Sequence, residues 1–216
     1  MDIGTMLGDA LDYTQEALVG KWMRWLILLI GTIIFPIILG YTLRVYRGEP
    51  RPPDPRDWVG VFVDGIKLFV VELIWAIPVI IVLLIFFGGA IALMTSGSNA
   101  ATAAGIGTML IGIPILIIVA IVVALFATMG AVRFARTDSF GEAFNFSAIL
   151  AHIGRIGWGH YILALIVLMV IIGVISFVLG IIPIIGWIIS IVIGPAISIY
   201  AARYMTQLYD SAPAPA

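Results

Sequence analysis

The chain has no cysteine and little charge, and each absence removes a class of function. Without cysteine there is no disulfide, no thiolate metal ligand and no thiol nucleophile. Charged residues make up 11% of the 216 residues and hydrophobic residues 62%, whereas soluble domains carry about 25% charged residues. A soluble fold needs polar side chains to cover its surface. The composition therefore excludes a water-soluble globule.

Two long stretches, residues 73–132 and 161–202, contain no Asp, Glu, Lys or Arg. A helix of about 20 apolar residues is long enough to cross a bilayer. The apolar runs and the turn signals between them predict membrane spans over residues 22–43, 73–94, 105–132, 158–179 and 183–203. The expected fold is an all-α integral membrane protein with about five transmembrane helices in a single domain, residues 1–216.

Three further segments carry one apolar and one polar face, as helices on a membrane surface do. They are residues 1–20, 57–71 and 139–153. The first is acidic, whereas most interfacial helices use Lys or Arg to bind anionic lipid. We therefore expect a protein contact to hold this helix.

The ends of three predicted spans share one spacing, which indicates a pseudo-repeat. Tyr41 stands three positions before Arg44, Tyr200 stands three positions before Arg203, and Arg133 ends the third span in the same way. Such repeats are common in transporters, and duplicated helical scaffolds give the same pattern. These five residues are candidate contacts of an anionic lipid, and simple anchoring of the span ends is the alternative.

The eleven Lys and Arg residues indicate the orientation, because short basic loops stay in the cytoplasm. In a five-span arrangement nine of them lie on one side, so the basic loops and the C-terminus of this cell-membrane protein are expected to be cytoplasmic. Lys21 and Arg24 then lie outside with the N-terminus. If residues 22–43 instead form a re-entrant hairpin, which gives six membrane segments, all eleven lie on one side.

Glu72 is the deepest ionisable residue of the predicted spans, and Asp64 and Lys67 precede it. Ionisable groups within membranes often mark ion or substrate pathways, so these three residues are a candidate intramembrane polar site. The structural alternatives are a headgroup-level position for Glu72 and a solvated pair between Asp64 and Lys67, three residues apart on a helix.

Small residues recur on one face of two predicted spans, which is typical of close helix packing in membranes. The positions are Ser190, Gly194, Ser198 and Ala202 in the last span, and Ala120, Ala124, Ala127 and Ala131 in the third. These faces pack within the bundle, against a second copy of the chain or against another membrane protein.

The sequence offers no catalytic, metal or cofactor motif. His152 and His160 are eight residues apart, which does not fit a helical pair of metal ligands. There is no glycine-rich phosphate loop and no pairing of a nucleophile with a base. A net charge of −1 gives no basic field for nucleic acid. We expect no enzymatic activity, metal, cofactor or nucleic-acid partner.

Two runs in the N-terminal part resemble a known family: GKWMRWLILLIGTIIFPIILGYTLRVYRG and DWVGVFVDGIKLFVVELIWAIP. They are similar to the opening of domain of unknown function 4013, a mainly archaeal family of multi-pass membrane proteins. The likeness rests on Gly40-Tyr41, Arg44, Arg47-Gly48, Trp58 and Asp64-Gly65. It implies a mostly helical protein of an archaeal plasma membrane, and it implies no activity, cofactor or catalytic residue.

The centres of the predicted spans offer no residues more polar than Thr, Ser and Gly, whereas a transporter needs polar groups that converge at mid-bilayer. We therefore expect a non-enzymatic membrane protein that organises lipid or a protein partner. The alternative is a small transporter or channel that uses the pseudo-repeat and Glu72.

Overall fold

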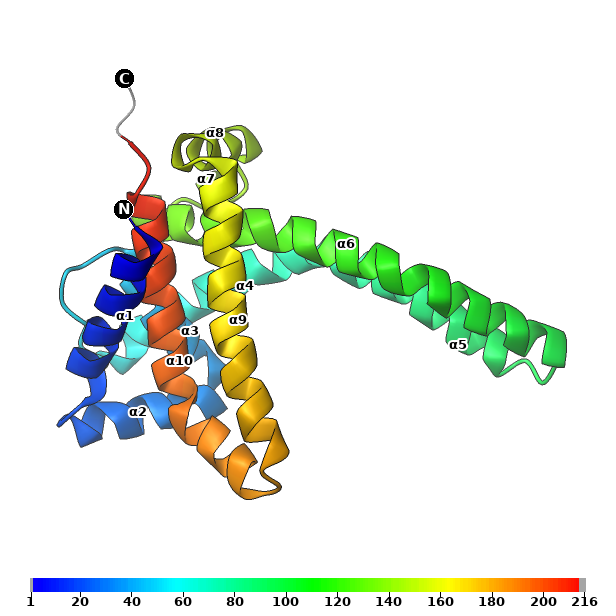
Figure 1. Cartoon of the computed structure of the whole chain (residues 1–216), viewed down its shortest axis with the longest axis horizontal. Helices are drawn as coiled ribbons and strands as arrows, with labels where there is room; N and C mark the ends of the chain where they lie inside the picture. Colours follow the sequence, from blue (N-terminus) through cyan, green and yellow to red (C-terminus); the bar gives the residue numbers. More distant parts are fainter. Residues whose placement is uncertain (1, 214–216) are drawn as a thin grey trace. The chain divides into compact units, whose positions relative to one another are not determined.

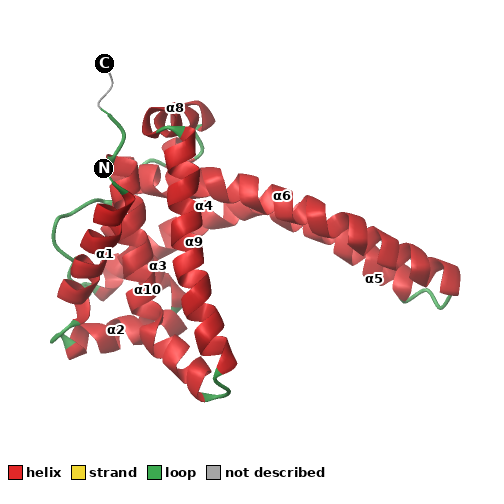
Figure 2. Cartoon of the chain, in the orientation of Figure 1, coloured by secondary structure: helices red, strands yellow, loops and turns green. Residues whose placement is uncertain are grey.

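The computed structural model describes residues 2–213, which form helices joined by loops and contain no strand (Figure 2). Four helical stretches are long and apolar enough to cross a membrane. They are Trp58–Met94, Asn99–Thr137, Trp158–Ile181 and Ile185–Asp210. The all-α membrane fold is thus confirmed, and each of these stretches overlaps one predicted span.

The chain divides into two compact units, one made of the residues up to Val70 together with those from Met129, the other of Val71–Thr128. The second unit is a helical hairpin. Its first arm is the continuation of α4 (Trp58–Leu83), then a π-helical turn (Leu84–Gly88) and α5 (Gly89–Met94). Its second arm belongs to α6 (Asn99–Thr137).

Glycines bring the two arms of this hairpin together. A Cβ added to Gly105 would lie 2.8 Å from the carbonyl oxygen of Ala90, which is closer than side chains tolerate. Trp75 and Phe126 stack with their ring centroids 6.4 Å apart. The outer faces of both arms expose large aliphatic side chains, as expected of helices that face lipid.

The first unit is built around α10 (Ile185–Asp210), which contacts α1 (Ile3–Leu18), α2 (Trp22–Ile33), α3 (Phe35–Tyr46) and α9 (Trp158–Ile181) (Figure 1). Its core is apolar. The buried members are Tyr13, Ala17, Leu18, Leu28, Tyr41, Val45, Ile199 and Ala202. The acidic helix α1 therefore has a protein contact along its apolar face.

Residues 22–43 do not form the single helix expected from their length. They form α2 and α3, which meet at Ile34, where the backbone leaves the helical region at φ −92° and ψ 76°. Pro36 gives the physical reason, because it cannot donate a helical hydrogen bond and it disfavours helical geometry at the residue before it. Each helix has 12 residues, about 18 Å of length, which is too short to cross a bilayer.

The predicted interfacial helix at 139–153 is also interrupted, into α7 (Phe140–Ala143) and α8 (Phe146–Ile156). Asn145 causes the break, because its side-chain oxygen accepts a hydrogen bond from the backbone N–H of Ala148 at 3.1 Å and caps α8. The segment at 57–71, in contrast, is the first part of α4 and continues into the span without a break.

Four long helices and a broken first segment favour the re-entrant alternative, with both termini on the side of the basic loops. We expect Asn99→Cys to react with a membrane-impermeant thiol reagent on intact cells, and Pro52→Cys and Thr5→Cys to be protected. The chain has no other cysteine, so each variant reports on one position. Labelling of Thr5→Cys at the level of Asn99→Cys would instead support five spans with the N-terminus outside.

Candidate functional site

Two glycines lie where α3 meets the start of α4 in the first unit. A Cβ on Gly40 would lie 1.7 Å from the carbonyl oxygen of Val61, and a Cβ on Gly65 would lie 1.6 Å from that of Pro36. Any side chain other than hydrogen would collide with backbone at both positions. The two glycines therefore let the backbones of α3 and α4 touch.

Asp64, next to this contact, binds two arginines of α3. Its carboxylate accepts hydrogen bonds from Arg44 Nε at 2.9 Å and from Arg47 Nη2 and Nη1 at 2.9 and 3.1 Å. Asp64 is 8% exposed, and Arg44 also binds the more exposed Asp57 at 2.9 Å. A buried carboxylate with this many charge-assisted hydrogen bonds is fully compensated, so the cluster clamps α3 onto α4.

The three residues of the predicted intramembrane polar site do not share one set of contacts. Asp64 and Lys67 do not pair with each other, because Lys67 binds Asp138 at 3.2 Å. Glu72 belongs to the other unit, where it is exposed and forms no hydrogen bond or ion pair with the described residues. The predicted pair between Asp64 and Lys67 was wrong because the arginines of α3 offer Asp64 better-placed donors.

The other arginines of the pseudo-repeat also have carboxylate partners. Arg133 donates to Glu142, and this hydrogen bond lowers the pKa of the Glu142 carboxyl. Arg203 donates to Asp9 of α1 at 2.8 Å and stacks over the ring of Tyr13 at 4.6 Å. Each repeat arginine thus contributes to holding helices together, and lipid binding by these residues stays a prediction.

The two tyrosines of the repeat differ in environment. Tyr41 is fully buried in the core of the first unit, and its hydroxyl has no hydrogen-bond partner in the described part of the chain. Tyr200 is half-buried and lines a groove on the surface of the same unit. Lipid contact by Tyr41 and Tyr200 stays a prediction.

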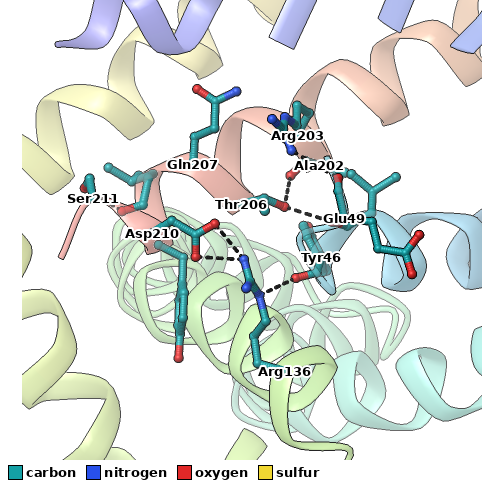
Figure 3. A network of polar contacts seen from close by, with 12 residues as sticks. Tyr46, Glu49, Arg136, Ala202, Arg203, Thr206, Gln207, Asp210 and Ser211 are labelled. Carbon is teal, nitrogen blue, oxygen red and sulfur yellow. Dashed lines mark hydrogen bonds and ion pairs between the residues drawn. The ribbon is translucent and has the colours of Figure 1, made fainter. Parts of the chain in front are cut away.

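A polar network joins the C-terminal ends of α3, α6 and α10 (Figure 3). Arg136 donates to both carboxylate oxygens of Asp210 at 2.7 Å and to the carbonyl oxygen of Tyr46 at 2.9 Å. Gly48 makes room for this guanidinium, because its φ of 82° is a glycine conformation and a Cβ there would lie 2.2 Å from Arg136 Nη2. Thr206 adds hydrogen bonds to carbonyl oxygens of α3 and α10.

His152 ties α8 to the end of α10. Its Nε2 donates to the carbonyl oxygen of Tyr209 at 2.9 Å, so Nδ1 is free to accept from Arg155 Nη2 at 3.0 Å. This arrangement requires a neutral imidazole. Burial lowers the pKa of His152, and the positive charges of Arg155 and Arg133 lower it further, against the Tyr209 carbonyl and Asp210, which raise it.

The small-residue faces are only partly buried. In α10, Ala202 is 1% exposed, and a Cβ on Gly194 would meet Thr32 of α2 at 3.7 Å, an ordinary contact. In α6, Ala131 is buried in the first unit, whereas Ala124 is exposed. The face in α10 therefore packs within the unit, and the face in α6 is only partly covered, with Ala120 and Ala127 half-buried.

An apolar groove of about 500 Å³ runs between α1, α9 and α10. Its lining is Leu7, Gly8, Leu11 and Thr14 of α1, Ile171, Ile172 and Ile175 of α9, and Ile193, Ala196, Ile197 and Tyr200 of α10. None of these side chains is charged, and the Thr14 hydroxyl already donates to the carbonyl oxygen of Ala10. Sequence reasoning missed this groove, because the groove depends on α1 packing against α10, a helix at the far end of the chain.

The described residues contain no group of three His, Asp or Glu side chains placed to hold a metal ion. A second cavity of about 410 Å³ is polar and lies beside the Asp64 cluster. It is lined by Arg44, Arg47, Glu49, Pro53, Asp54, Arg56 and Asp57. Most of its arginine donors are already bound to carboxylates, so this cavity has little free capacity for an anion.

Removing the Asp64 carboxylate tests the clamp. Asp64→Asn leaves two arginines without their shared partner, and we expect the free energy of unfolding to fall by about 2–3 kcal/mol. Removing one partner of a fully buried ion pair costs roughly 3–5 kcal/mol, and the effect here is smaller because Arg47 is 35% exposed. The measurement is unfolding in mixed detergent micelles. Asp54→Asn is the matched control, because its pair with Arg56 is largely exposed and such pairs contribute little to stability. Equal effects in the two variants would contradict the clamp.

The neutral state of His152 predicts a pH dependence. Its pKa is lower in the fold than the value of about 6.5 in an unfolded chain, so the unfolded state binds more protons as pH falls below 6.5. The contribution of His152 to stability is therefore complete above about pH 6.5 and declines below it. We expect the melting temperature of the wild type to fall below about pH 6.5 in part through His152. That part of the fall should disappear in His152→Gln and remain in His160→Gln. A component that survives in His152→Gln would rule out His152 as its source.

No curated protein and no solved structure matches the chain. A family described as "Protein of unknown function (DUF4013)" matches residues 25–184, which is more than half of the chain. The matched region begins within α2 and ends at the turn before α10, so it includes the contact of α3 with α4 and the hairpin of α5 and α6. The chain therefore belongs to the DUF4013 family.

Proposed function

We propose that this protein is a non-enzymatic, multi-pass protein of the cell membrane that organises lipid. Its basic loops and C-terminus face the cytoplasm, and the groove between α1, α9 and α10 holds one hydrocarbon chain of a membrane lipid. The groove is the observation that carries the proposal, because its lining is uncharged and almost entirely aliphatic.

The position of the groove favours a lipid chain as its occupant. Ile171, Ile172 and Ile175 lie well inside α9, and Ile193 and Ile197 lie well inside α10, and both helices are candidate membrane spans. In a bilayer these residues face hydrocarbon. A volume of about 500 Å³ also falls within the roughly 300–1,000 Å³ typical of sites for small ligands.

The physics of binding at this depth is packing and not water exclusion. Lipid tails are as apolar as the groove, so the hydrophobic effect adds little, and shape fit with van der Waals contact decides which chain is held. The absence of charge from the lining also leaves no acid or base beside the occupant. The groove therefore supports holding a lipid and offers no chemistry on it.

Filling the groove should displace its lipid. A Cβ on Gly8 would meet nothing within 4 Å, so Gly8→Trp places an indole over the groove without a backbone collision. With phosphatidylcholine that carries a photoreactive chain, we expect crosslinks to peptides of α1, α9 and α10 in the wild type, and about fivefold fewer in Gly8→Trp.

Gly173→Trp is the control, because Gly173 lies on α9 outside the groove and its Cβ also meets nothing within 4 Å. It should crosslink like the wild type. Labelling spread evenly over the exposed faces of the spans, unchanged by Gly8→Trp, would show that the groove holds no particular lipid.

A further inference from the structure

The ion pairs leave a small set of cations without a carboxylate. Within residues 2–213, seven Lys and Arg side chains form ion pairs, and the remaining four are Lys21, Arg24, Arg51 and Arg155. Arg155 is engaged by His152 and a backbone carbonyl oxygen. Lys21 and Arg24 lie one turn apart at the start of α2 and line the same cavity.

This cavity, of about 270 Å³, is cationic. Its lining consists of Lys21, Met23, Arg24, Ile27, Asp54, Pro55 and Arg56, which gives three positive groups and one carboxylate. The carboxylate of Asp54 is already bound by Arg56 at 2.5 and 2.8 Å. The cavity therefore keeps an excess of positive charge, and neither Lys21 nor Arg24 forms an ion pair within the described residues.

Backbone contacts position both side chains. Lys21 Nζ donates to the carbonyl oxygen of Glu16 at 2.6 Å, and Arg24 Nη1 lies 3.5 Å from that of Ala17. These contacts use one donor of each group. The remaining N–H groups are available to an anion, and the fixed side chains lose little entropy on binding one.

The surface beside the cavity is apolar and exposed. Trp22 is 75% exposed and Met23 is 70% exposed, and Leu26, Ile30 and Ile33 continue this face along α2. Trp22 and Trp25 stack with ring centroids 5.8 Å apart, as aromatic residues do at a membrane interface. α2 is too short to span a bilayer. Its cations at one end suit a lipid headgroup, and its apolar outer face suits the lipid chains.

We propose that Lys21 and Arg24 bind the phosphate of an anionic phospholipid whose chains lie along the exposed face of α2. The contact is electrostatic at the cavity, where basic residues near an anionic surface favour binding, and apolar along the helix. This site rests on the proposed lipid-organising function only for the presence of lipid, since it shares no residue with the groove.

The test compares lipids of identical chains and different headgroups. Native mass spectra of the full chain, released from detergent with phosphatidylglycerol or phosphatidylcholine, should show preferential retention of phosphatidylglycerol. We expect the preference to fall about fivefold or more in Lys21→Gln/Arg24→Gln. It should persist in Lys21→Arg/Arg24→Lys, which keeps both charges, and in Arg51→Gln, which removes an unpaired cation outside the cavity.

Three results would overturn the proposal. Equal retention of the two lipids by the wild type excludes headgroup selection, and an equal loss of preference in Arg51→Gln assigns it to overall charge. Complete displacement of phosphatidylglycerol by inorganic phosphate at constant ionic strength shows a site for free phosphate. Retention of phosphatidylcholine tests the groove separately. It should fall in Gly8→Trp and stay unchanged in Lys21→Gln/Arg24→Gln.

Discussion

The carboxylate of Asp64 is the contact on which the first unit depends. It can reach two arginines of α3 only because Gly40 and Gly65 let the backbones of α3 and α4 touch. Burying it without those arginines would leave a charge in an apolar setting, at a cost of several kcal/mol. The same contact fixes where α3 ends. From there Gly48 turns the chain and leaves the space in which Arg136 binds Asp210 of α10.

This contact also gives the family resemblance a physical meaning. The residues that carry the likeness include Gly40, Arg44, Arg47, Asp64 and Gly65, and all five meet at the contact of α3 with α4. Two are glycines whose Cβ would collide with backbone, and three are the charges of one compensated cluster. The signature therefore describes a folding constraint that requires these residue types. It gives no indication of a reaction.

Local patterns predicted the long helices well and the polar partners poorly. A long uncharged apolar run satisfies its backbone hydrogen bonds in a bilayer by forming a helix, so α9, α10 and the hairpin could be located from sequence alone. The partners of Asp64 lie 17 and 20 residues away, and the pair of Asp9 with Arg203 joins residues 194 apart. Helical spacing instead suggested Lys67 for Asp64. Pro36 breaks the helix locally, and the two short helices on either side of it, α2 and α3, both pack on α10, a contact that the apolar run of residues 22–43 does not reveal.

The distribution of ion pairs changes how the basic residues of this membrane protein are understood. Counted along the sequence, eleven Lys and Arg residues suggest a broadly cationic face, and the pseudo-repeat points to its arginines as lipid ligands. In the fold, Arg44, Arg133 and Arg203 are each neutralised by a carboxylate of the same chain. A neutralised guanidinium attracts anionic lipid only weakly, because its field is cancelled within a few ångströms. Attraction to such lipid is therefore concentrated where no carboxylate of the described residues forms an ion pair, at Lys21 and Arg24, the two bases that a five-span arrangement separates from the other nine.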